Sequence, residues 1–340
     1  MNENIPPVDE LDDLSEEAVN KRVEESATVA ETASGQRLDQ AAAELFSSYS
    51  RSKLQAWIKS GELTVNGSKA KTRDKMLGGE LLELKAELQE QGSWQPEAID
   101  LDIVYEDSDI LVLNKPMGLV VHPAAGNHTG TLLNALLHHC PDLIHVPRAG
   151  IVHRLDKDTT GLMVVAKTLE AHTDLVAQLQ ERSVSREYEA ISQGVMTGGG
   201  MVEANIGRHP KQRTKMAVLN FGGKEAITHY RVIKRFDAYT HIRLKLETGR
   251  THQIRVHMAH IGYPLVGDSA YAGRFKIPKG LDKALIEKLR GFPRQALHAA
   301  QLGLIHPTSG EYMEWDAELP ADMVDLLADL KASQTGFETL

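Results

Sequence analysis

The sequence predicts an α+β fold organised as two domains. Strand-like and helix-like segments follow one another without the regular strand–helix–strand alternation that builds a doubly wound parallel sheet. The chain has 340 residues, which is enough for two domains and for a sizeable core in one of them. Its composition, 41% hydrophobic and 25% charged residues, is typical of a soluble globular protein.

The N-terminal segment 1–30 is acidic, lacks aromatic residues and contains Pro6-Pro7. Because such a segment buries little apolar surface, we expect it to be a disordered tail or a mobile helix. Residues 1–36 carry ten Asp and Glu against two Lys and Arg, so this region accounts for −8 of the net charge of −9. The rest of the chain is nearly neutral, and its overall charge does not exclude an anionic partner.

Two regions of the chain carry an excess of positive charge. Residues 37–75 hold eight Lys and Arg against four Asp and Glu, and residues 208–257 hold twelve against three. Such regions can supply the basic surface that nucleic-acid phosphates need. The alternative is that these charges are only solvated faces, but segregation on this scale favours a nucleic-acid partner.

Residues 31–85 are expected to form a small domain. Segments 35–46 and 50–59 place apolar residues at helical intervals. Segment 63–69 is typical of a strand followed by a tight Asn-Gly turn. The charge-rich and Gln-rich stretch 86–96 is the expected linker. The candidate nucleic-acid-binding residues on the second helix and beyond the turn are Arg51, Lys53, Lys59 and Lys69.

Residues 97–330 are expected to form the larger domain, and residues 331–340 a C-terminal tail. Strands are expected from short β-branched and apolar runs, and helices from apolar residues three or four positions apart. The expected strands are two within 103–116 and one each at 161–166, 186–194, 226–234 and 240–248; the expected helices are 131–138, 169–182 and 282–290.

A polar loop directly precedes the apolar strand 161–166. Seven polar residues fall within positions 153–160, where groups beside a core strand must be paired or hydrogen-bonded. Asp156, two residues from Arg154, therefore has the position of a catalytic carboxylate. It could equally be a turn aspartate, because Asp-Lys-Asp-Thr-Thr-Gly is also good turn chemistry. The residues alone leave both interpretations open.

Two further segments carry candidate site residues. Tyr188 lies on the expected strand 186–194, where a core tyrosine is the simpler interpretation. In residues 246–257, Gly249 interrupts a strand. A short helix or a further strand then begins at Gln253. Arg255 in this second part could contact a phosphate or form a structural ion pair.

The sequence indicates neither a metal nor a nucleotide cofactor. The fifteen histidines form no His-Glu-x-x-His motif, and a single cysteine, Cys140, excludes a Cys-rich zinc site. There is no phosphate-binding P-loop and no GxGxxG followed by an acidic partner. No stretch reaches the length of a membrane span, and the N-terminus has no apolar signal segment, so we expect a cytoplasmic location.

Residues 150–162, Gly-Ile-Val-His-Arg-Leu-Asp-Lys-Asp-Thr-Thr-Gly-Leu, resemble the signature of the RluA-type RNA pseudouridine synthases, whose hallmark is His-Arg-Leu-Asp. Within this family the chain is most similar to the RluD branch, which modifies large-subunit ribosomal RNA. The resemblance covers about residues 30 to 330 and implies a mixed, largely antiparallel sheet. Residues 31–85 are similar to the αL-type RNA-binding domain first recognised in a small-subunit ribosomal protein, which implies a grip on phosphates.

The resemblance also implies roles for individual residues. Asp156 is expected to be the catalytic carboxylate, with Arg255 as the ion-pair partner that keeps it ionised. Tyr188 is expected to stack on the target base, because a flipped pyrimidine needs an aromatic face. The expected substrate-binding residues are His153, Arg154, Arg250 and His252.

The predicted activity is the isomerisation of uridine to pseudouridine in large-subunit ribosomal RNA or a pre-ribosomal particle. Bonds rearrange within one molecule, so no cofactor is needed; we expect a monomer with no membrane partner. A non-catalytic RNA-binding ribosome-assembly factor is the alternative. A nucleoside or glycoside hydrolase is a third possibility, but it needs two working carboxylates, and Asp158 is the obvious second one.

Overall fold

The computed structural model of the chain describes residues 21–46, 51–88, 94–123, 129–212, 214–278 and 280–334. The chain divides into two compact units, residues 1–93 and residues 94–340, each with its own hydrophobic core. Among the helices in the described ranges, none is long and apolar enough to cross a membrane.

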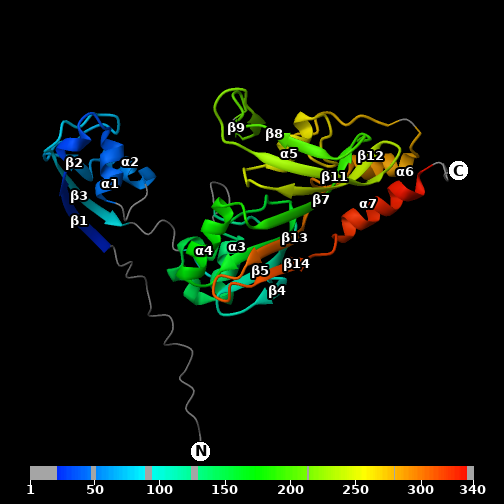
Figure 1. Cartoon of the computed structure of the whole chain (residues 1–340), viewed down its shortest axis with the longest axis horizontal. Coiled ribbons are helices and arrows are strands. Elements are labelled where there is room, and N and C mark those ends of the chain that lie inside the picture. Colours follow the sequence, from blue (N-terminus) through cyan, green and yellow to red (C-terminus); the bar gives the residue numbers. More distant parts are fainter. Residues whose placement is uncertain are drawn as a thin grey trace, which may run out of the picture. The chain divides into compact units, whose positions relative to one another are not determined.

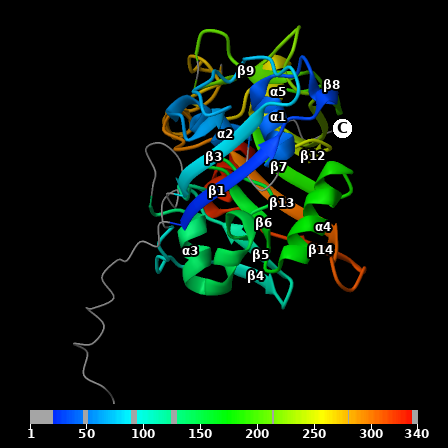
Figure 2. The same cartoon turned by 90° about the vertical axis from the view of Figure 1, so that its left-hand side faces the viewer.

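The first unit is a three-stranded antiparallel sheet covered by two helices (Figures 1 and 2). Leu38, Leu54 and Leu84 are fully buried between the helices and the sheet. Asn66 and Gly67 both have positive φ (50° and 74°), as the predicted tight turn requires. The strands, in sheet order, are β1 (Lys21–Thr28), β3 (Leu81–Leu88) and β2 (Leu63–Val65), and the helices are α1 (Leu38–Leu45) and α2 (Arg51–Ser60).

The prediction that residues 1–30 form a disordered tail is wrong for residues 21–28. Residues 21–28 form β1, which pairs with β3 along its whole length. The acidic composition concealed a strand whose Val23 is buried and which leads into the buried Val29. Because β3 continues to residue 88, it also takes up the start of the predicted linker 86–96. Residues 1–20 lie outside the described residues.

The second unit is built on one nine-stranded sheet. Its order is β4-β5-β6-β13-β7-β12-β11-β8, with β14 paired to β13. The pairings of this sheet are antiparallel except that β13 and β6 are parallel. The predicted α+β class with a mixed, largely antiparallel sheet is therefore confirmed.

The strands of this sheet are β4 (Ile103–Glu106), β5 (Ile110–Lys115), β6 (Thr160–Ala166), β7 (Ser185–Gln193), β8 (Gly200–Glu203), β11 (Ile227–Arg235), β12 (Tyr239–Leu246), β13 (Leu297–Ile305) and β14 (Tyr312–Asp316). A separate two-stranded sheet joins β9 (Ile206–Arg208) and β10 (Met216–Val218). The helices are α3 (Leu132–His139), α4 (Leu169–Gln180), α5 (Gln253–His260), α6 (Lys283–Arg290) and α7 (Ala321–Ala332). In this unit α3 and α4 lie at one end, and α6 packs with α7 at the other (Figure 1).

The central strand β13 was not predicted. It is rich in small residues, which have little intrinsic preference for strands. The backbone of β13 also lies very close to β6: a Cβ added to Gly161 of β6 would lie 2.2 Å from the carbonyl oxygen of Ala299. The close approach of these two strands therefore depends on glycine. Helix α7 was also missed, and it extends two residues into the predicted tail 331–340.

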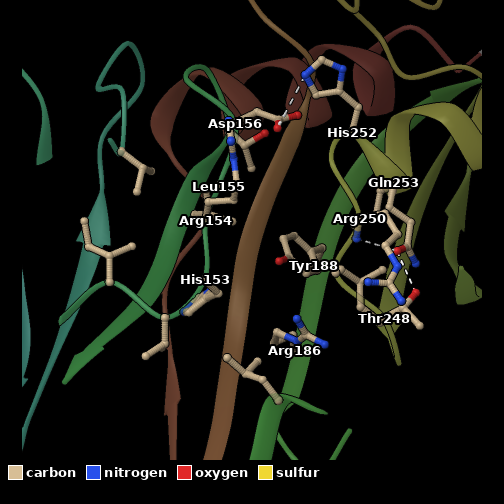
Figure 3. Close-up of a pocket in the computed structure, with 18 of the residues that line it drawn as sticks. His153, Arg154, Leu155, Asp156, Arg186, Tyr188, Thr248, Arg250, His252 and Gln253 are labelled. Atoms are coloured by element: carbon tan, nitrogen blue, oxygen red, sulfur yellow. Dashed lines mark hydrogen bonds and ion pairs between the residues drawn. The ribbon is translucent and has the colours of Figure 1, made fainter. Parts of the chain in front are cut away.

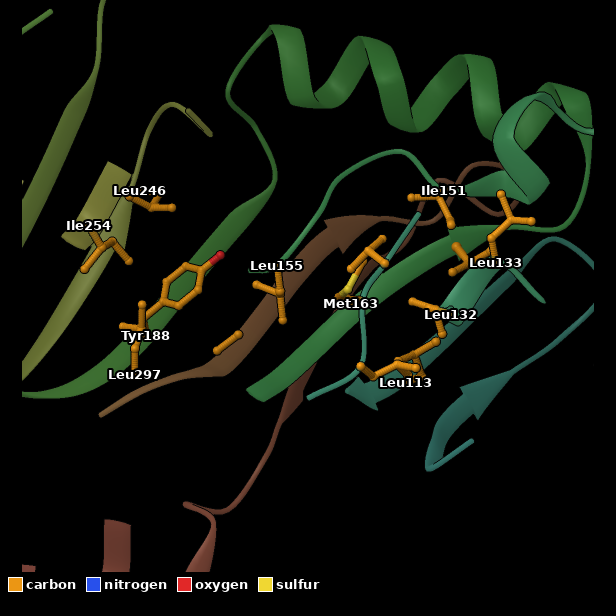
Figure 4. Close-up of a cluster of buried hydrophobic side chains, with 14 of the residues drawn as sticks. Leu113, Leu132, Leu133, Ile151, Leu155, Met163, Tyr188, Leu246, Ile254 and Leu297 are labelled. Carbon is orange, nitrogen blue, oxygen red and sulfur yellow. The ribbon is translucent and has the colours of Figure 1, made fainter. Parts of the chain in front are cut away.

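The core of the second unit reaches the polar loop (Figure 4). Leu155 is only 4% exposed and packs in the same cluster as Tyr188 and Leu297. The side chain of Leu155 thus anchors the loop in the core, next to the position of Asp156.

Candidate active site

A pocket of about 870 Å³ lies in the second unit (Figure 3). It is lined by the polar loop, by β7, by the segment between β12 and α5, and by one side of α4. All seven pocket residues that the sequence predicted line it together: His153, Arg154, Asp156, Tyr188, Arg250, His252 and Arg255.

The carboxylate of Asp156 forms an ion pair with Arg255. Nη1 of Arg255 lies 3.0 Å from Oδ2 of Asp156, and the side chain of Asp156 is 14% exposed. Nε and Nη2 of the same guanidinium donate to Oδ2 and Oδ1 of Asp268 at 2.8 and 2.9 Å. Burial lowers the pKa of Arg255, but the two carboxylates outweigh burial and raise it. Arg255 is therefore a fixed cation that pairs with the Asp156 carboxylate and orients it.

Asp268 was missed by the sequence prediction, although it fixes Arg255. Its side chain is fully buried and also accepts the backbone N–H groups of Ala270 and Tyr271. The available signal was an Asp in a Gly-Asp-Ser turn directly after a buried apolar pair. Its partner is 13 residues away in the chain, so only the fold reveals the contact.

His252 approaches the same carboxylate from the other side. Its Nε2 lies 3.8 Å from Oδ1 of Asp156, and Tyr271 packs edge-on against its ring at 5.6 Å between centroids. The backbone of His252 is left-handed (φ 57°) at the N-terminus of α5. Burial lowers the pKa of His252, whereas the Asp156 charge acts in the opposite direction.

The segment before α5 is held by a buried amide. Oε1 of Gln253 accepts hydrogen bonds from the Thr248 hydroxyl and the Arg250 N–H, at 2.8 and 2.9 Å. Its Nε2 donates to the carbonyl oxygen of Ile227 and to Thr228. The side chains of this segment that line the pocket thus project from a rigid turn.

The polar loop is held by a buried lysine. Nζ of Lys115, at the end of β5, donates to the carbonyl oxygens of Pro116, Leu119 and Lys157 at 2.8 to 3.0 Å. Burial lowers the pKa of this ammonium to about 8, although Asp158 and Asp156 oppose the shift. Lys115 was not predicted; a lysine ending an apolar strand directly before a proline was the available signal.

The turn interpretation of Asp156 is correct for its backbone only. The carbonyl oxygen of Asp156 accepts the N–H of Thr159 at 3.0 Å, which closes a turn. Within the described residues, however, the carboxylate contacts Arg255 and His252 and caps no backbone N–H.

Tyr188 is both a core residue and a pocket residue. It is 6% exposed and packs against Leu246 and Ile254, while its ring lines the pocket (Figures 3 and 4). Burial raises the pKa of its hydroxyl, and the nearby Asp156 charge adds to this effect. The ring therefore offers a neutral, rigid surface.

The remaining predicted pocket residues differ in their contacts. Nε2 of His153 accepts the N–H of Val164 at 3.1 Å, so this ring ties the loop to β6. Burial and the Arg186 charge lower the pKa of His153, which keeps the ring neutral. Arg250 donates to the carbonyl oxygen of Glu225 at 2.9 Å. Arg154 is exposed on the pocket lining.

The predicted RNA-binding residues of the first unit are partly committed to its own structure. Arg51 pairs with the fully buried Asp39 at 2.8 Å, and Nζ of Lys69 donates to the carbonyl oxygen of Ser60. Burial raises the pKa of Asp39, but hydrogen bonds from Arg51 and neighbouring side chains outweigh it and lower the pKa to about 2. Lys59 is exposed. The side chain of Lys53 lies outside the described residues.

One group of possible metal ligands lies among the described residues: Asp107, Asp109 and His306. Oδ2 of Asp107 already contacts His306 at 2.9 Å and accepts the hydroxyl proton of Tyr105 at 2.7 Å. Its Oδ1 accepts the N–H groups of Asp109 and Ile110. These contacts show that Asp107 caps the turn between β4 and β5, which accounts for the clustering of the three side chains.

Two protein-family models match parts of this chain. Residues 109–260 match the family model described as RNA pseudouridylate synthase, and residues 36–81 match the S4 domain. The chain is similar to "Ribosomal large subunit pseudouridine synthase D" of Pseudomonas aeruginosa, with 61% identity over 93% of this chain and 98% of the relative. It is also similar to the protein of that name from Yersinia pestis, with 60% identity over 94% and 98%.

Two solved human structures are similar in fold and sequence. The structure named RNA Pseudouridylate Synthase Domain Containing 4 is 27% identical, with a TM-score of 0.53 over 67% of this chain and 92% of that one. The structure named RNA Pseudouridylate Synthase Domain Containing 1 is 26% identical, with a TM-score of 0.50 over 72% and 99%.

Proposed function

The chain belongs to the RluD branch of the RluA-type RNA pseudouridine synthases, and we propose that it isomerises uridines of large-subunit ribosomal RNA at the pocket around Asp156. The observation that carries the site assignment is the ion pair between Asp156 and Arg255 beside the ring of Tyr188, in one pocket. A carboxylate, a fixed cation and an aromatic face are the three groups that the reaction requires.

Asp156 is proposed as the group that does the chemistry. The reaction breaks the bond between N1 of uracil and C1′ of ribose and rejoins the ring through C5. An ionised carboxylate supports this by attacking C1′ or C6, or by removing a proton from the ribose. Arg255 is held by Asp268 and so keeps the carboxylate oriented before RNA arrives.

Tyr188 is proposed as the platform for the target base. The reacting atoms cannot be reached inside a helix, so the uridine must be flipped out of its stack. A ring held by Leu246 and Ile254 offers a flat face without further loss of side-chain freedom. Stacking also retains the uracil ring after its bond to the ribose has broken.

The pocket favours an isomerase over a hydrolase with two carboxylates. Asp158 is absent from the described lining of the pocket. Glu247 does line it, but its carboxylate is engaged by His229 at 2.6 Å and by Arg182 at 3.3 Å. Asp156 is thus the carboxylate available for the chemistry.

The first unit is proposed as the domain that binds the phosphates of the RNA. Residues 36–81 of this unit match the S4 domain, and its residues 37–75 carry an excess of positive charge. Its exposed side chains include Lys59. Contacts of this kind fix the register of the RNA and carry no sequence information directly. We further expect the protein to act as a monomer in the cytoplasm, which gel filtration and cell fractionation would test.

Tritium release tests the proposed function against its alternatives. Ribosomal RNA labelled at C5 of uracil loses its label when the new C5–C1′ bond forms. We expect release of tritium with no free uracil. Free uracil would indicate a hydrolase, and RNA binding without release would indicate a non-catalytic assembly factor.

A further inference from the structure

Arg186 is a buried cation whose hydrogen-bonding capacity is largely unused. It is 7% exposed, and its Nε has no hydrogen-bond partner among the described residues. Its Nη2 donates only a long hydrogen bond, 3.3 Å, to the carbonyl oxygen of Glu247. Arg255 and Arg294, the other buried arginines, each contact a carboxylate at 2.7 to 2.8 Å. A buried guanidinium with unsatisfied N–H donors lowers the stability of the fold, unless a ligand accepts those hydrogen bonds.

The position of Arg186 directs these donors into the pocket. It precedes Tyr188 by two residues on β7, so both side chains lie on the same face of the strand. Both line the pocket, and in Figure 3 the Tyr188 ring lies between Asp156 and Arg186. Burial lowers the pKa of the Arg186 guanidinium; Tyr188 acts in the opposite direction, and the charge of Arg250 adds to the lowering. An electron-rich partner would relieve both effects.

The proposed reaction fixes which part of the substrate meets this cation. Asp156 must reach the ribose or C6, so a uracil stacked on Tyr188 turns its N1 edge toward Asp156. Its opposite edge, which carries O4, then points toward Arg186. We propose that Arg186 donates to O4 of the flipped uracil and is a specificity-determining and catalytic residue. This inference rests on the proposed function.

A phosphate is the less suitable ligand for Arg186. The phosphates of a flipped nucleotide stay nearer the surface, because the nucleotide rotates about its backbone to bring the base into the pocket. Arg148 and Arg154 line the same pocket and are exposed, so they are placed for phosphates. The buried Arg186 is placed for the base.

Two consequences follow for the chemistry. Cytosine carries an amino group where uracil has O4, and arginine has no acceptor for it, so cytidine would leave buried donors unpaired. When the N1–C1′ bond breaks, its electron pair passes into the uracil ring and O4 carries part of the charge. Arg186 stabilises this charge. The C5–C1′ bond then forms, the proton leaves C5 and N1 gains one.

A substrate-and-enzyme cycle tests the contact. Single-turnover rates would be measured for the wild type and Arg186→Met on RNA carrying uridine or 4-thiouridine, whose sulfur is a weaker acceptor, at the target position. The single-turnover rate of the wild type should be about 10-fold lower on 4-thiouridine than on uridine, because a hydrogen bond to a charged group is lost. Arg186→Met should be about 100-fold slower on uridine, as for a lost oxyanion donor, and should show no further loss with 4-thiouridine.

Arg148→Met is the matched control, because it removes an exposed arginine from the same pocket. It should weaken RNA binding and lower the salt dependence, yet keep the wild-type preference for uridine over 4-thiouridine. Arg186→Met should leave RNA affinity within a few-fold of wild type. Its thermal melt should not fall, because the substitution removes a buried cation that lacks a carboxylate partner.

Either of two results would overturn the inference. If Arg186→Met kept the 4-thiouridine penalty and instead lost affinity and salt dependence, Arg186 would be a phosphate contact. If it kept both rate and preference, Arg186 would have no part in the site. Should Arg186→Met fail to fold, Arg186→Leu replaces it, because leucine also lacks a donor for O4, and an unchanged 4-thiouridine penalty there would count against the contact. Pseudouridine formation by the wild type tests the proposed function separately.

Discussion

The hydroxyl oxygen of Tyr271 lies 2.6 Å from Nδ1 of His252. The same hydroxyl accepts the backbone N–H of Met216 at 3.0 Å, so its own proton is free to point toward the histidine. Nδ1 of a neutral His252 is then the acceptor, and its proton sits on Nε2, the atom facing Asp156. A tyrosine that does not touch Asp156 thus sets which face of the imidazole the carboxylate meets.

Tyr271→Phe should disturb this arrangement while keeping the ring that packs under Arg255 at 5.0 Å. The ¹⁵N spectrum of His252 should change from one tautomer to a mixture, because Nδ1 loses its donor. Pseudouridine formation should fall by about 10-fold, and stability by about 1 kcal/mol, as the Met216 N–H loses its acceptor. An unchanged ¹⁵N spectrum would contradict the assignment.

Asp156→Asn preserves the size of the side chain and removes its charge. If Asp156 carries out the chemistry, single-turnover pseudouridine formation should fall by several orders of magnitude. RNA affinity should change little, because the phosphates are bound by other residues. A purely structural turn aspartate would instead cost about 1 kcal/mol in a thermal melt and leave activity largely intact. Substantial activity in a folded variant would refute the catalytic role.

Substitutions of Tyr188 separate its ring from its hydroxyl. Tyr188→Phe should keep the platform, whereas Tyr188→Ala should lose about 1–3 kcal/mol of stacking, measured as weaker binding of the target uridine. Circular dichroism is the control, because Tyr188 also packs in the core. Equal losses of activity from the two folded variants would point to proton transfer by the hydroxyl.

Lys115 predicts a pH-dependent contribution to stability. Burial lowers the pKa of its ammonium from 10.5 to about 8, so between these values the unfolded chain binds this proton more tightly than the folded chain. The free energy of unfolding should therefore gain a contribution that increases as pH rises from about 8 to about 10.5. Urea unfolding across this range should show a flatter pH dependence for Lys115→Met than for wild type. Parallel curves would show that the lysine does not titrate there.

Removal of residues 1–93 tests whether the first unit supplies the contacts to RNA phosphates. The second unit has its own core, so it should fold, which circular dichroism would verify. Binding to long ribosomal RNA should weaken, and the slope of log K against log salt should fall by about 0.9 for each phosphate that the shortened protein no longer neutralises. An unchanged slope would assign the phosphate contacts to the second unit.

The sequence was most informative where the chemistry is local. Asp156 stands in one short segment whose resemblance to a family signature indicated a catalytic carboxylate without the fold, although the residues alone left a turn aspartate open. Asp268 could not be assigned, because it becomes a site residue only when the fold brings it to Arg255. Arg186 looked like any strand arginine, since its missing partner is a property of the packed pocket.

Strands were missed where composition conceals the usual pattern. In β1, acidic residues surround the buried Val23, so the segment resembled a disordered tail. In β13, small side chains give no β-branched signal, and its close approach to β6 depends on Gly161 in the partner strand.

The place of β13 in the sheet has a consequence for synthesis of the protein. β6 continues the loop of Asp156, and β7 carries Tyr188, but the two strands are joined only through β13. The ribosome makes both halves of the site well before it reaches Leu297. A nascent chain therefore cannot close its pocket until β13 has emerged and inserted between them. We therefore expect chains that end before β13 to lack pseudouridine formation, even where their first unit still binds RNA.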